Sequence, residues 1–403
     1  MESYLFDWAN LLLRWLHVIA AIAWIGSSFY FVFLDKNLLA PADPDLKAKG
    51  VDGVLWSVHG GGFYHPQKYM VAPKTGIDSK LHWFYWEAYT TWLAGFALFA
   101  VMYLWNAGTL LVDKRVFDWS PVAAGVAAVG FLVVFWLLYD GICRIFKFQE
   151  KTIGALIVVM VVFGTWLAYH LFSARAAFLI SGAMMATAMS ANVFFIIIPG
   201  QRKVVNTMLG GKPYDKDALA VYGKQGKQRS VHNTYFTLPV VIAMLSNHYN
   251  FAYNHAHGWL VLLLLFVVGV LIRQYFVLRN DWHLGKRGNP WPYAAASVVV
   301  AIGTIAWMIP TPSANAVNEA ALPKVVDYAQ LKPILEKRCY LCHGATVQQN
   351  GLRFDDENVV MAHAADIYRQ VVVTKNMPFS NATQMTDEER ALVGVWFKGL
   401  STH

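Results

Sequence analysis

The sequence predicts an all-α protein: a polytopic membrane bundle of eight transmembrane helices followed by a small helical domain outside the lipid. Hydrophobic residues make up 57% of the 403-residue chain, whereas charged residues make up only 14%. Apolar runs of about 20 residues, the length that crosses a bilayer as a helix, recur through most of the chain. The C-terminal segment has no such run and contains a compact cysteine motif.

Each predicted span corresponds to one of these apolar runs. The eight runs cover residues 10–34, 82–105, 119–140, 152–172, 176–198, 231–248, 257–278 and 291–310. Buried helices of a large soluble protein are the alternative, but several runs contain no charged residue over a full bilayer thickness. No small-residue cleavage site follows a short apolar core in the first run, so we expect a retained anchor rather than a removed signal peptide.

Basic residues are concentrated in alternate loops, those that follow the first, third, fifth and seventh spans. These residues are Lys36, Lys47, Lys49, Lys68, Lys74, Lys80, Arg144, Lys147, Lys151, Arg202, Lys203, Lys212, Lys216, Lys224, Lys227, Arg229, Arg279, Lys286 and Arg287. The opposite loops hold little beyond Lys114, Arg115 and Arg175. Positively charged loops stay in the cytoplasm, so we expect both termini in the periplasm of a bacterial inner membrane. The net charge of +8 is then mostly loop charge and indicates no nucleic-acid partner.

The C-terminal segment reads Cys339-Tyr340-Leu341-Cys342-His343, the Cys-x-x-Cys-His attachment motif of a c-type haem. In this motif both thiols bond to the porphyrin, and the histidine becomes an axial iron ligand. The chain has only three cysteines, and Cys143 lies in a distant apolar run, so no second cysteine pair completes a zinc site. The sequence therefore predicts one covalent haem c, attached outside the membrane.

Met377, followed by Pro378, lies at a suitable distance downstream to be the second axial ligand, and a thioether in that position raises the reduction potential. Met385, Met361 and His363 are the alternatives.

A small class I-like cytochrome c domain is the expected setting of this motif. Residues 326–338 predict a helix that leads into the motif, and residues 387–400 predict a closing helix whose start at Thr386 carries a capping signal. We expect a membrane domain over residues 1–312, a linker over 313–323 and a periplasmic cytochrome c domain over 324–403.

Five histidines in or at the ends of the predicted spans form two levels. His17, His170 and His248 are expected near the outer surface, and His82 and His232 near the inner one. His232 and His248 are separated by roughly 24 Å of helix, which is most of a bilayer. Ionisable residues in spans are costly, and membrane b-type cytochromes stack two haems between paired histidines, so these five are candidate ligands of one or two haem b groups. The alternative is that each histidine lies at the interface and bonds to water or carbonyl groups.

The expected inner loops combine aromatic and polar side chains. Residues 60–69 contain three glycines followed by His65 and Lys68, and residues 82–87 and 229–235 add further rings, amides and a guanidinium. Such groups can form a pocket in which a flat, anionic heterocycle stacks on rings and meets cations. An ordinary aromatic belt with positive inner loops is the alternative.

Over essentially its whole length the chain resembles the PuuD-type membrane urate hydroxylases, urate oxidases with a fused cytochrome c. The resemblance rests on Leu12 to Tyr30, Trp56 to Tyr64, His232 to Pro239, Cys339 to His343 and Asn376-Met377-Pro378. It implies that cytoplasmic urate is oxidised to 5-hydroxyisourate with water as the oxygen source. It also implies that electrons leave through the cytochrome domain to a soluble cytochrome or terminal oxidase, without hydrogen peroxide.

Chemistry suggests which residues act on urate. His65, His232 and Tyr235 suit the proton transfer that a two-electron oxidation requires. Lys68, Arg229 and Asn233 suit binding of the urate monoanion. The sequence shows no flavin or nicotinamide fingerprint and does not indicate the oligomeric state.

Two other functions fit the same sequence features. One is a membrane electron-transfer module that passes electrons from quinol to cytochrome c without urate chemistry. The other is a transporter with a redox-sensing tail.

A cysteine introduced at Lys216 should react with a thiol reagent only from the cytoplasmic side, because its loop is one of the basic ones. A cysteine introduced at Lys114 is the matched control and should react from outside. Labelling of the Lys216 position from the periplasm would overturn the predicted orientation.

Overall fold

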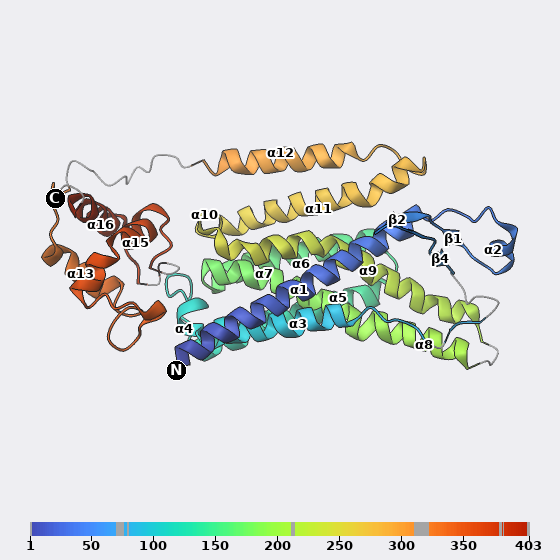
Figure 1. Ribbon diagram of the computed structural model, residues 1–403, viewed down its shortest axis with the longest axis horizontal. Helices are drawn as coiled ribbons and strands as arrows, with labels where there is room; N and C mark the ends of the chain where they lie inside the picture. Colours follow the sequence, from blue (N-terminus) through green and yellow to red (C-terminus); the bar gives the residue numbers. More distant parts are fainter. Residues whose placement is uncertain are drawn as a thin grey trace.

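The computed structural model describes residues 2–69, 76–78, 80–210, 214–309, 322–378, 381 and 383–400. The described chain is mostly helical: long helices form an elongated bundle, and the C-terminal helices form a separate group beyond one end of it (Figure 1). The N-terminus, α4 and α10 lie at that same end, whereas the short strands lie at the other (Figure 1).

The bundle contains long helices and several short helical turns. Its helical elements are α1 (Glu2–Asn37), α2 (Pro44–Ala48), α3 (Trp86–Phe99), the π-helical turn η1 (Ala100–Leu104), α4 (Ala107–Leu110), α5 (Pro121–Phe146), α6 (Glu150–Leu171), α7 (Ala174–Ala191), the π-helical turn η2 (Asn192–Ile197), α8 (Ile198–Leu209), α9 (Lys216–Leu245), the 3₁₀ turn η3 (Ser246–His248), α10 (Asn250–Tyr253), α11 (Gly258–His283) and α12 (Trp291–Trp307).

Each of the eight predicted spans overlaps helical structure. Five helices are long and apolar enough to cross a membrane: the segments Tyr4–Asn37, Pro121–Phe146, Glu150–Leu171, Ala174–Leu209 and Gly258–His283. α12 is apolar but shorter. The structure therefore supports several membrane-type helices, and the full set of eight spans stays a prediction.

α7 lies at the centre of the bundle and packs against α5, α6 and α9. Its sequence is rich in alanine, serine and glycine, and small side chains let neighbouring helices approach closely. The approach is tightest at Gly182, where an added Cβ would lie 2.5 Å from the Cβ of Ala243 on α9. The small residues of α7 thus set the helix spacing around which the bundle's core forms.

Four short strands between α1 and α3 depart from the predicted all-α fold. β1 (Gly53–Val54) pairs antiparallel with β4 (Gln67–Lys68), and β2 (Ser57–His59) pairs antiparallel with β3 (Gly62–Tyr64). Gly60 and Gly61 join β2 to β3 with φ angles of 58° and 80°. A tight hairpin turn needs positive φ at both central residues, which glycine adopts readily, so this glycine run forms a turn rather than a hinge.

The predicted inner loop between the spans that end at 198 and begin at 231 is largely helical. α8 continues the helix of α7 and η2 to Leu209, and α9 begins at Lys216, well before the predicted span at 231. Asp215 caps the start of α9 by accepting hydrogen bonds from the backbone N–H groups of Asp217 and Ala218. The cap allows a polar helix to extend beyond the apolar part of the bundle.

The C-terminal group is built on its own hydrophobic core, which includes Leu331, Leu335, Val393 and Trp396. Its helical elements are α13 (Tyr328–Arg338), η5 (Gln349–Gly351), α14 (Glu357–Ala362), α15 (Ala364–Tyr368), the π-helical turn η6 (Arg369–Val373) and α16 (Asp387–Leu400). The predicted helices at 326–338 and 387–400 are confirmed as α13 and α16. The predicted linker at 313–323 lies almost wholly outside the described residues.

The predicted capping signal before α16 is also confirmed. The Thr386 hydroxyl accepts a hydrogen bond from the Glu389 backbone N–H at 3.2 Å, and the Glu389 carboxylate accepts one from the Thr386 N–H at 2.8 Å. Glu389 also binds Arg338 of α13, which ties the two helices of the domain together.

Gly182→Ala should lower the stability of the bundle by about 1–3 kcal/mol, because the new methyl group overpacks the contact between α7 and α9. Gly130→Ala on α5 is the matched control: no atom lies within 4 Å of the added Cβ, so it should be neutral or stabilise by up to about 1 kcal/mol. Thermal unfolding in detergent measures both effects. Equal stability of the two variants would contradict the close packing described.

Candidate functional site

A buried ion pair lies in the bundle half opposite the C-terminal domain. Arg229 of α9 donates from Nη2 to Asp140 Oδ1 of α5 at 2.6 Å, and both side chains are almost completely buried. Arg144, one turn further along α5, donates to the second oxygen of Asp140 at 2.5 Å but is largely exposed. The pair cancels the Arg229 charge, so Arg229 is less suited to binding a substrate anion than its sequence position suggested.

Two asparagines extend the ion pair into a network. Asn192, fully buried where η2 begins, donates to the Tyr139 hydroxyl at 3.0 Å and to Asn233 Oδ1 at 2.9 Å. Asn233 in turn donates to the Met189 carbonyl at 3.0 Å. A π-helical turn locally alters the direction of side chains, and such turns are frequent at functional sites. Here the turn sets Asn192 between α5 and α9.

His232 links this network to the protein surface. Its Nδ1 lies 2.8 Å from the Tyr139 hydroxyl, and its Nε2 lies 3.6 Å from the Glu150 carboxylate at the start of α6. Tyr139 is fully buried, whereas the Glu150 side chain is 57% exposed. The three side chains form a chain of proton donors and acceptors that runs from solvent into the bundle.

The structure does not gather at one point four of the residues predicted to act on urate: His65, His232, Tyr235 and Lys68. Tyr235 faces a different helix from His232 and donates to Gln274 Oε1 of α11. His65 stacks on Trp56, with ring centroids 4.1 Å apart, and Lys68 pairs with Asp35 at 2.5 Å. His232 therefore joins the buried network, while Tyr235, His65 and Lys68 lie in separate surroundings.

Among the predicted membrane haem ligands, His17 has the most suitable geometry. Its Nδ1 lies 2.8 Å from the Thr91 carbonyl oxygen on α3, so Nδ1 carries the proton and Nε2 keeps its lone pair. The ring also lies against Gly95, where an added Cβ would be 2.7 Å from Cε1. His17 is thus held between α1 and α3 in the tautomer that a metal ligand needs.

The other four candidates are placed differently. His170 is exposed and binds the Trp166 carbonyl of its own helix at 2.7 Å. His248 is exposed in η3, and His82 is exposed before α3 begins. Both ring nitrogens of His232 already have partners. Within the described residues, no cluster of three or more histidine, cysteine, aspartate or glutamate side chains is arranged to hold a metal ion.

The cysteine motif follows α13 directly. Burial raises the pKa of the Cys339 thiol to about 12 and also raises the pKa of Cys342, so both sulfurs carry protons at neutral pH. Both cysteines are free thiols. Burial lowers the pKa of His343, which keeps the imidazole neutral, the form that binds iron. The His343 ring packs on Phe354, with centroids 4.7 Å apart.

Met377 packs against the same core as Cys339 and Tyr340. The buried Arg390 of α16 anchors its loop by donating to the Met377 carbonyl at 2.6 Å and to the Val371 carbonyl at 2.5 Å. Of the alternative ligands, Met385 belongs to this same core. Met385 is 4% exposed in the core, whereas Met361 is exposed and His363 faces Asp366 at 3.5 Å.

Tyr139, Asp140, Glu150 and Asn192 were missed in the sequence analysis. Asp140 is the only acid in its predicted span, and an ionisable residue within a span is itself a signal of a functional or structural site. That reasoning was applied only to the histidines. Tyr139, Glu150 and Asn192 carry no comparable signal, because their importance depends on helix packing.

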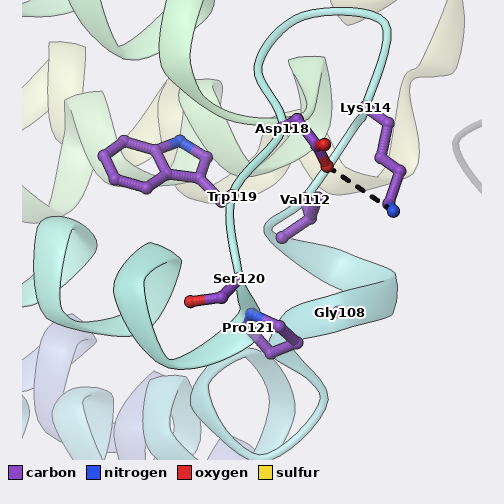
Figure 2. Close-up of a pocket in the computed structure, with 7 residues that line it drawn as sticks. All are labelled: Gly108, Val112, Lys114, Asp118, Trp119, Ser120 and Pro121. Atoms are coloured by element: carbon purple, nitrogen blue, oxygen red, sulfur yellow. Dashed lines mark ion pairs between the residues drawn. The ribbon is translucent and has the colours of Figure 1, made fainter.

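A surface pocket of about 420 Å³ lies where α4 approaches the start of α5, at the end of the bundle that faces the C-terminal domain (Figure 2). It is lined by Gly108, Val112, Lys114, Asp118, Trp119, Ser120 and Pro121. Lys114 and Asp118 form an exposed ion pair at 3.5 Å. None of the predicted site residues lines this pocket, so it is not where their chemistry converges.

Comparison with known proteins gives one family. Residues 3–309 match the family described as urate oxidase N-terminal, and the match covers the whole bundle. No curated protein and no solved structure matches the chain significantly.

Arg229→Gln should destabilise the bundle by about 3–5 kcal/mol, because it leaves the buried Asp140 carboxylate without its main partner. Arg144→Gln is the matched control: it removes the exposed partner of the same carboxylate and should cost no more than about 1 kcal/mol. Thermal unfolding of the two variants in detergent makes the comparison. If both substitutions lowered stability by the same small amount, the buried pair would not be holding α5 to α9.

Proposed function

The chain belongs to the urate oxidase N-terminal family, and on that premise we propose that it is a membrane-bound urate hydroxylase. It oxidises urate to 5-hydroxyisourate at the cytoplasmic face and passes the electrons to a haem c in its C-terminal domain. Membership of the family supports a urate-related oxidoreductase. The membrane location, the haem and the electron path are our own additions.

One observation carries the proposal. A bundle that matches a urate oxidase family is continuous in one chain with a small helical domain that bears Cys-x-x-Cys-His. An oxidase that used molecular oxygen directly would have no need of such a domain. Fusion of the two parts is explained if electrons from urate leave through the domain.

The residues of the C-terminal domain fit a covalent haem. Cys339, Cys342 and His343 follow α13 in the order and spacing that the attachment requires, and Met377 lies against the same core. The buried indole N–H of Trp396 has no hydrogen-bond partner among the described residues, which suits a group with acceptor oxygens entering this core. When bound, haem c supplies one-electron acceptance.

The reaction sets what the protein's residues must do. Urate and water yield 5-hydroxyisourate, two protons and two electrons. The oxygen atom comes from water, so no hydrogen peroxide forms, and the two electrons leave one at a time. The chain must therefore bind an anion, position a water molecule and remove two protons from a site shielded from bulk solvent.

The chain of Tyr139, His232 and Glu150 suits the removal of protons. His232 accepts a proton through the Tyr139 hydroxyl and passes it to Glu150, whose carboxylate reaches solvent. Asn192 holds the Tyr139 hydroxyl in place. In this assignment His232 is a proton relay, and Tyr235, His65 and Lys68 lie outside the relay.

The arrangement of charge supports the proposed sidedness. Lys36, Lys68, Lys227 and Arg287 form ion pairs at the bundle end that carries the strands, whereas the C-terminal domain lies at the opposite end (Figure 1). If the basic end faces the cytoplasm, the N-terminus and the cytochrome domain face the periplasm. Urate would then be bound and oxidised on one side and its electrons delivered on the other.

Electrons that cross most of a bilayer need an intermediate carrier, and we propose haem b in this role, one or two groups per chain. His17 is the leading candidate ligand, because its free Nε2 and the close approach of Gly95 suit a flat ring between helices. The final acceptor is a soluble cytochrome or a terminal oxidase.

Purified protein reconstituted in lipid should show reduction of its haem c absorption bands when urate is added without oxygen. Quinol should not cause this reduction. Reduction by quinol but not by urate would favour the alternative, a quinol-to-cytochrome c relay. Urate flux into vesicles without haem reduction would favour a transporter with a redox-sensing tail.

His232→Gln should slow urate-dependent haem reduction by about 10²-fold or more, the usual contribution of a positioned acid–base group, while haem content stays unchanged. His283→Gln on the exposed end of α11 is the control and should leave the rate as it is. Loss of non-covalent haem in His232→Gln would instead make His232 a haem ligand.

A further inference from the structure

Three arginines of the described chain are at least 95% buried, and two of them are fully accounted for. Arg229 pairs with Asp140, and Arg390 donates to two backbone carbonyls and to Asn381. Arg273 of α11 is 5% exposed, yet its Nε and Nη2 atoms have no hydrogen-bond partner among the described residues. An unpaired charge inside a helical bundle is costly, so its persistence indicates a missing partner of negative charge.

The unpaired atoms lie on one edge of the guanidinium. Nε–H and Nη2–H point in parallel and together bind two acceptor atoms of a planar group. Elsewhere in this protein the same edge is filled by a carboxylate: Arg338 binds Glu389 in this way, Arg115 binds Asp113 and Arg353 binds Asp355. Arg273 differs from these three arginines because no carboxylate of the described residues binds this edge.

No carboxylate of the described residues forms an ion pair with Arg273. The nearest acid on α11 is Asp281, two turns away, and it is held by Lys36 at 2.6 Å and Arg287 at 3.9 Å. Phe29 of α1 covers the face of the guanidinium, with the Cζ atom 3.9 Å from the ring centroid. Phe29 stabilises the cation through its ring face but offers no hydrogen-bond acceptor to the edge.

Two polar side chains lie near Arg273: Gln274, the next residue on α11, and Tyr235 of α9. The Gln274 carbonyl oxygen accepts a hydrogen bond from the Tyr235 hydroxyl, which leaves the Gln274 amide N–H₂ group to donate to a ligand. Tyr235 also interacts electrostatically with Arg273. α1, α9 and α11 thus contribute an aromatic ring, a phenol, an amide and a bidentate cation. This set matches a small, flat anion whose edge carries adjacent oxygen and nitrogen acceptors.

We propose that Arg273, with Gln274, Tyr235 and Phe29, is the binding site for the urate monoanion. The proposal rests on the proposed function, because urate is the planar, singly charged oxopurine that this function requires. It also gives Tyr235 a different role. The Tyr235 hydroxyl orients the Gln274 amide that contacts the substrate, and it does not accept a proton from urate.

The approach to this site from the basic end of the bundle is also positively charged. Asp35 lies on α1 roughly 9 Å beyond Phe29 along the helix axis and binds both Lys68 and Lys227. One carboxylate shared by two ammonium groups leaves a net positive charge, which attracts an anion toward the site. Lys68 therefore acts at the entrance, in agreement with its predicted part in anion binding.

Equilibrium binding of urate to the purified holoprotein in detergent, measured by calorimetry, tests the site without turnover. Arg273→Gln should raise the Kd for urate at least tenfold. Arg273→Lys should lie between it and the wild type, because lysine keeps the charge but loses the two parallel donors. Arg279→Gln, an exposed arginine on the same helix, is the control and should bind urate as the wild type does.

Gln274→Glu gives a test that does not depend on removing the arginine. The new carboxylate places a negative charge beside the proposed anion site, so it should weaken urate binding by at least tenfold. Haem content, measured as pyridine haemochrome, should stay unchanged in all variants.

The outcomes separate this site from the proposed function. If the wild type binds no urate, the proposed function fails. If the wild type binds urate and Arg273→Gln binds it equally well, only the assignment of Arg273 is overturned. Loss of non-covalent haem in Arg273→Gln with unchanged urate affinity would also overturn it, because the missing anion would then be a haem carboxylate.

Discussion

Burial of charge between helices is the constraint on which this structure depends. The interior of the bundle offers no water to a cation, so each arginine there needs a partner of opposite charge or a set of acceptors. Asp140 forms an ion pair with Arg229, and this pair joins α5 to α9. The asparagines, Tyr139 and His232 then assemble around that pair, because the pair fixes the rotation of both helices.

Arg273 is equally subject to this constraint but has no partner of opposite charge among the described residues. Arg229 and Arg273 are similarly buried, but only Arg229 is neutralised within the described residues. Arg229 holds two helices together, and Arg273 in our proposal binds the substrate. α9 serves both sites, since Arg229 and His232 face α5 and α6 while Tyr235 faces α11. A substrate at Arg273 and a proton relay at His232 would therefore lie on two sides of one helix.

The proposed steps take place at opposite ends of the molecule. The anion-attracting groups and the relay occupy the half that carries the strands, and the cysteine motif lies beyond the other end (Figure 1). Asn250, the first residue of α10, donates a hydrogen bond to the Thr374 carbonyl, in the loop that leads to Met377. This contact places the loop of the proposed axial ligand against the bundle, where an electron would have to pass.

Much of the fold could be predicted from local pattern. Apolar runs predict the long helices, and Thr386 and Glu389 predict the start of α16. The hairpin at Gly60 and Gly61 was missed, because three glycines in a row suit a hinge as well as a turn.

The site was predicted only in part, for a physical reason. His232, Arg229 and Asn233 were predicted to lie near one another, and all three lie on α9. Their partners Asp140, Tyr139 and Asn192 come from α5 and η2, and sequence alone does not show which helices face each other. Arg273 did carry a readable signal, since it is the only charged residue in its predicted span, but the search for ionisable residues in spans considered only histidines.

The central claim is that electrons taken from urate at the basic end of the bundle emerge at a haem on the opposite side of the membrane. The most direct test uses sealed vesicles of known orientation, with urate added to the outside only and no urate carrier present. The account predicts that haem c is reduced in inside-out vesicles, which expose the cytoplasmic face, and stays oxidised in right-side-out vesicles. Reduction in right-side-out vesicles alone would contradict it.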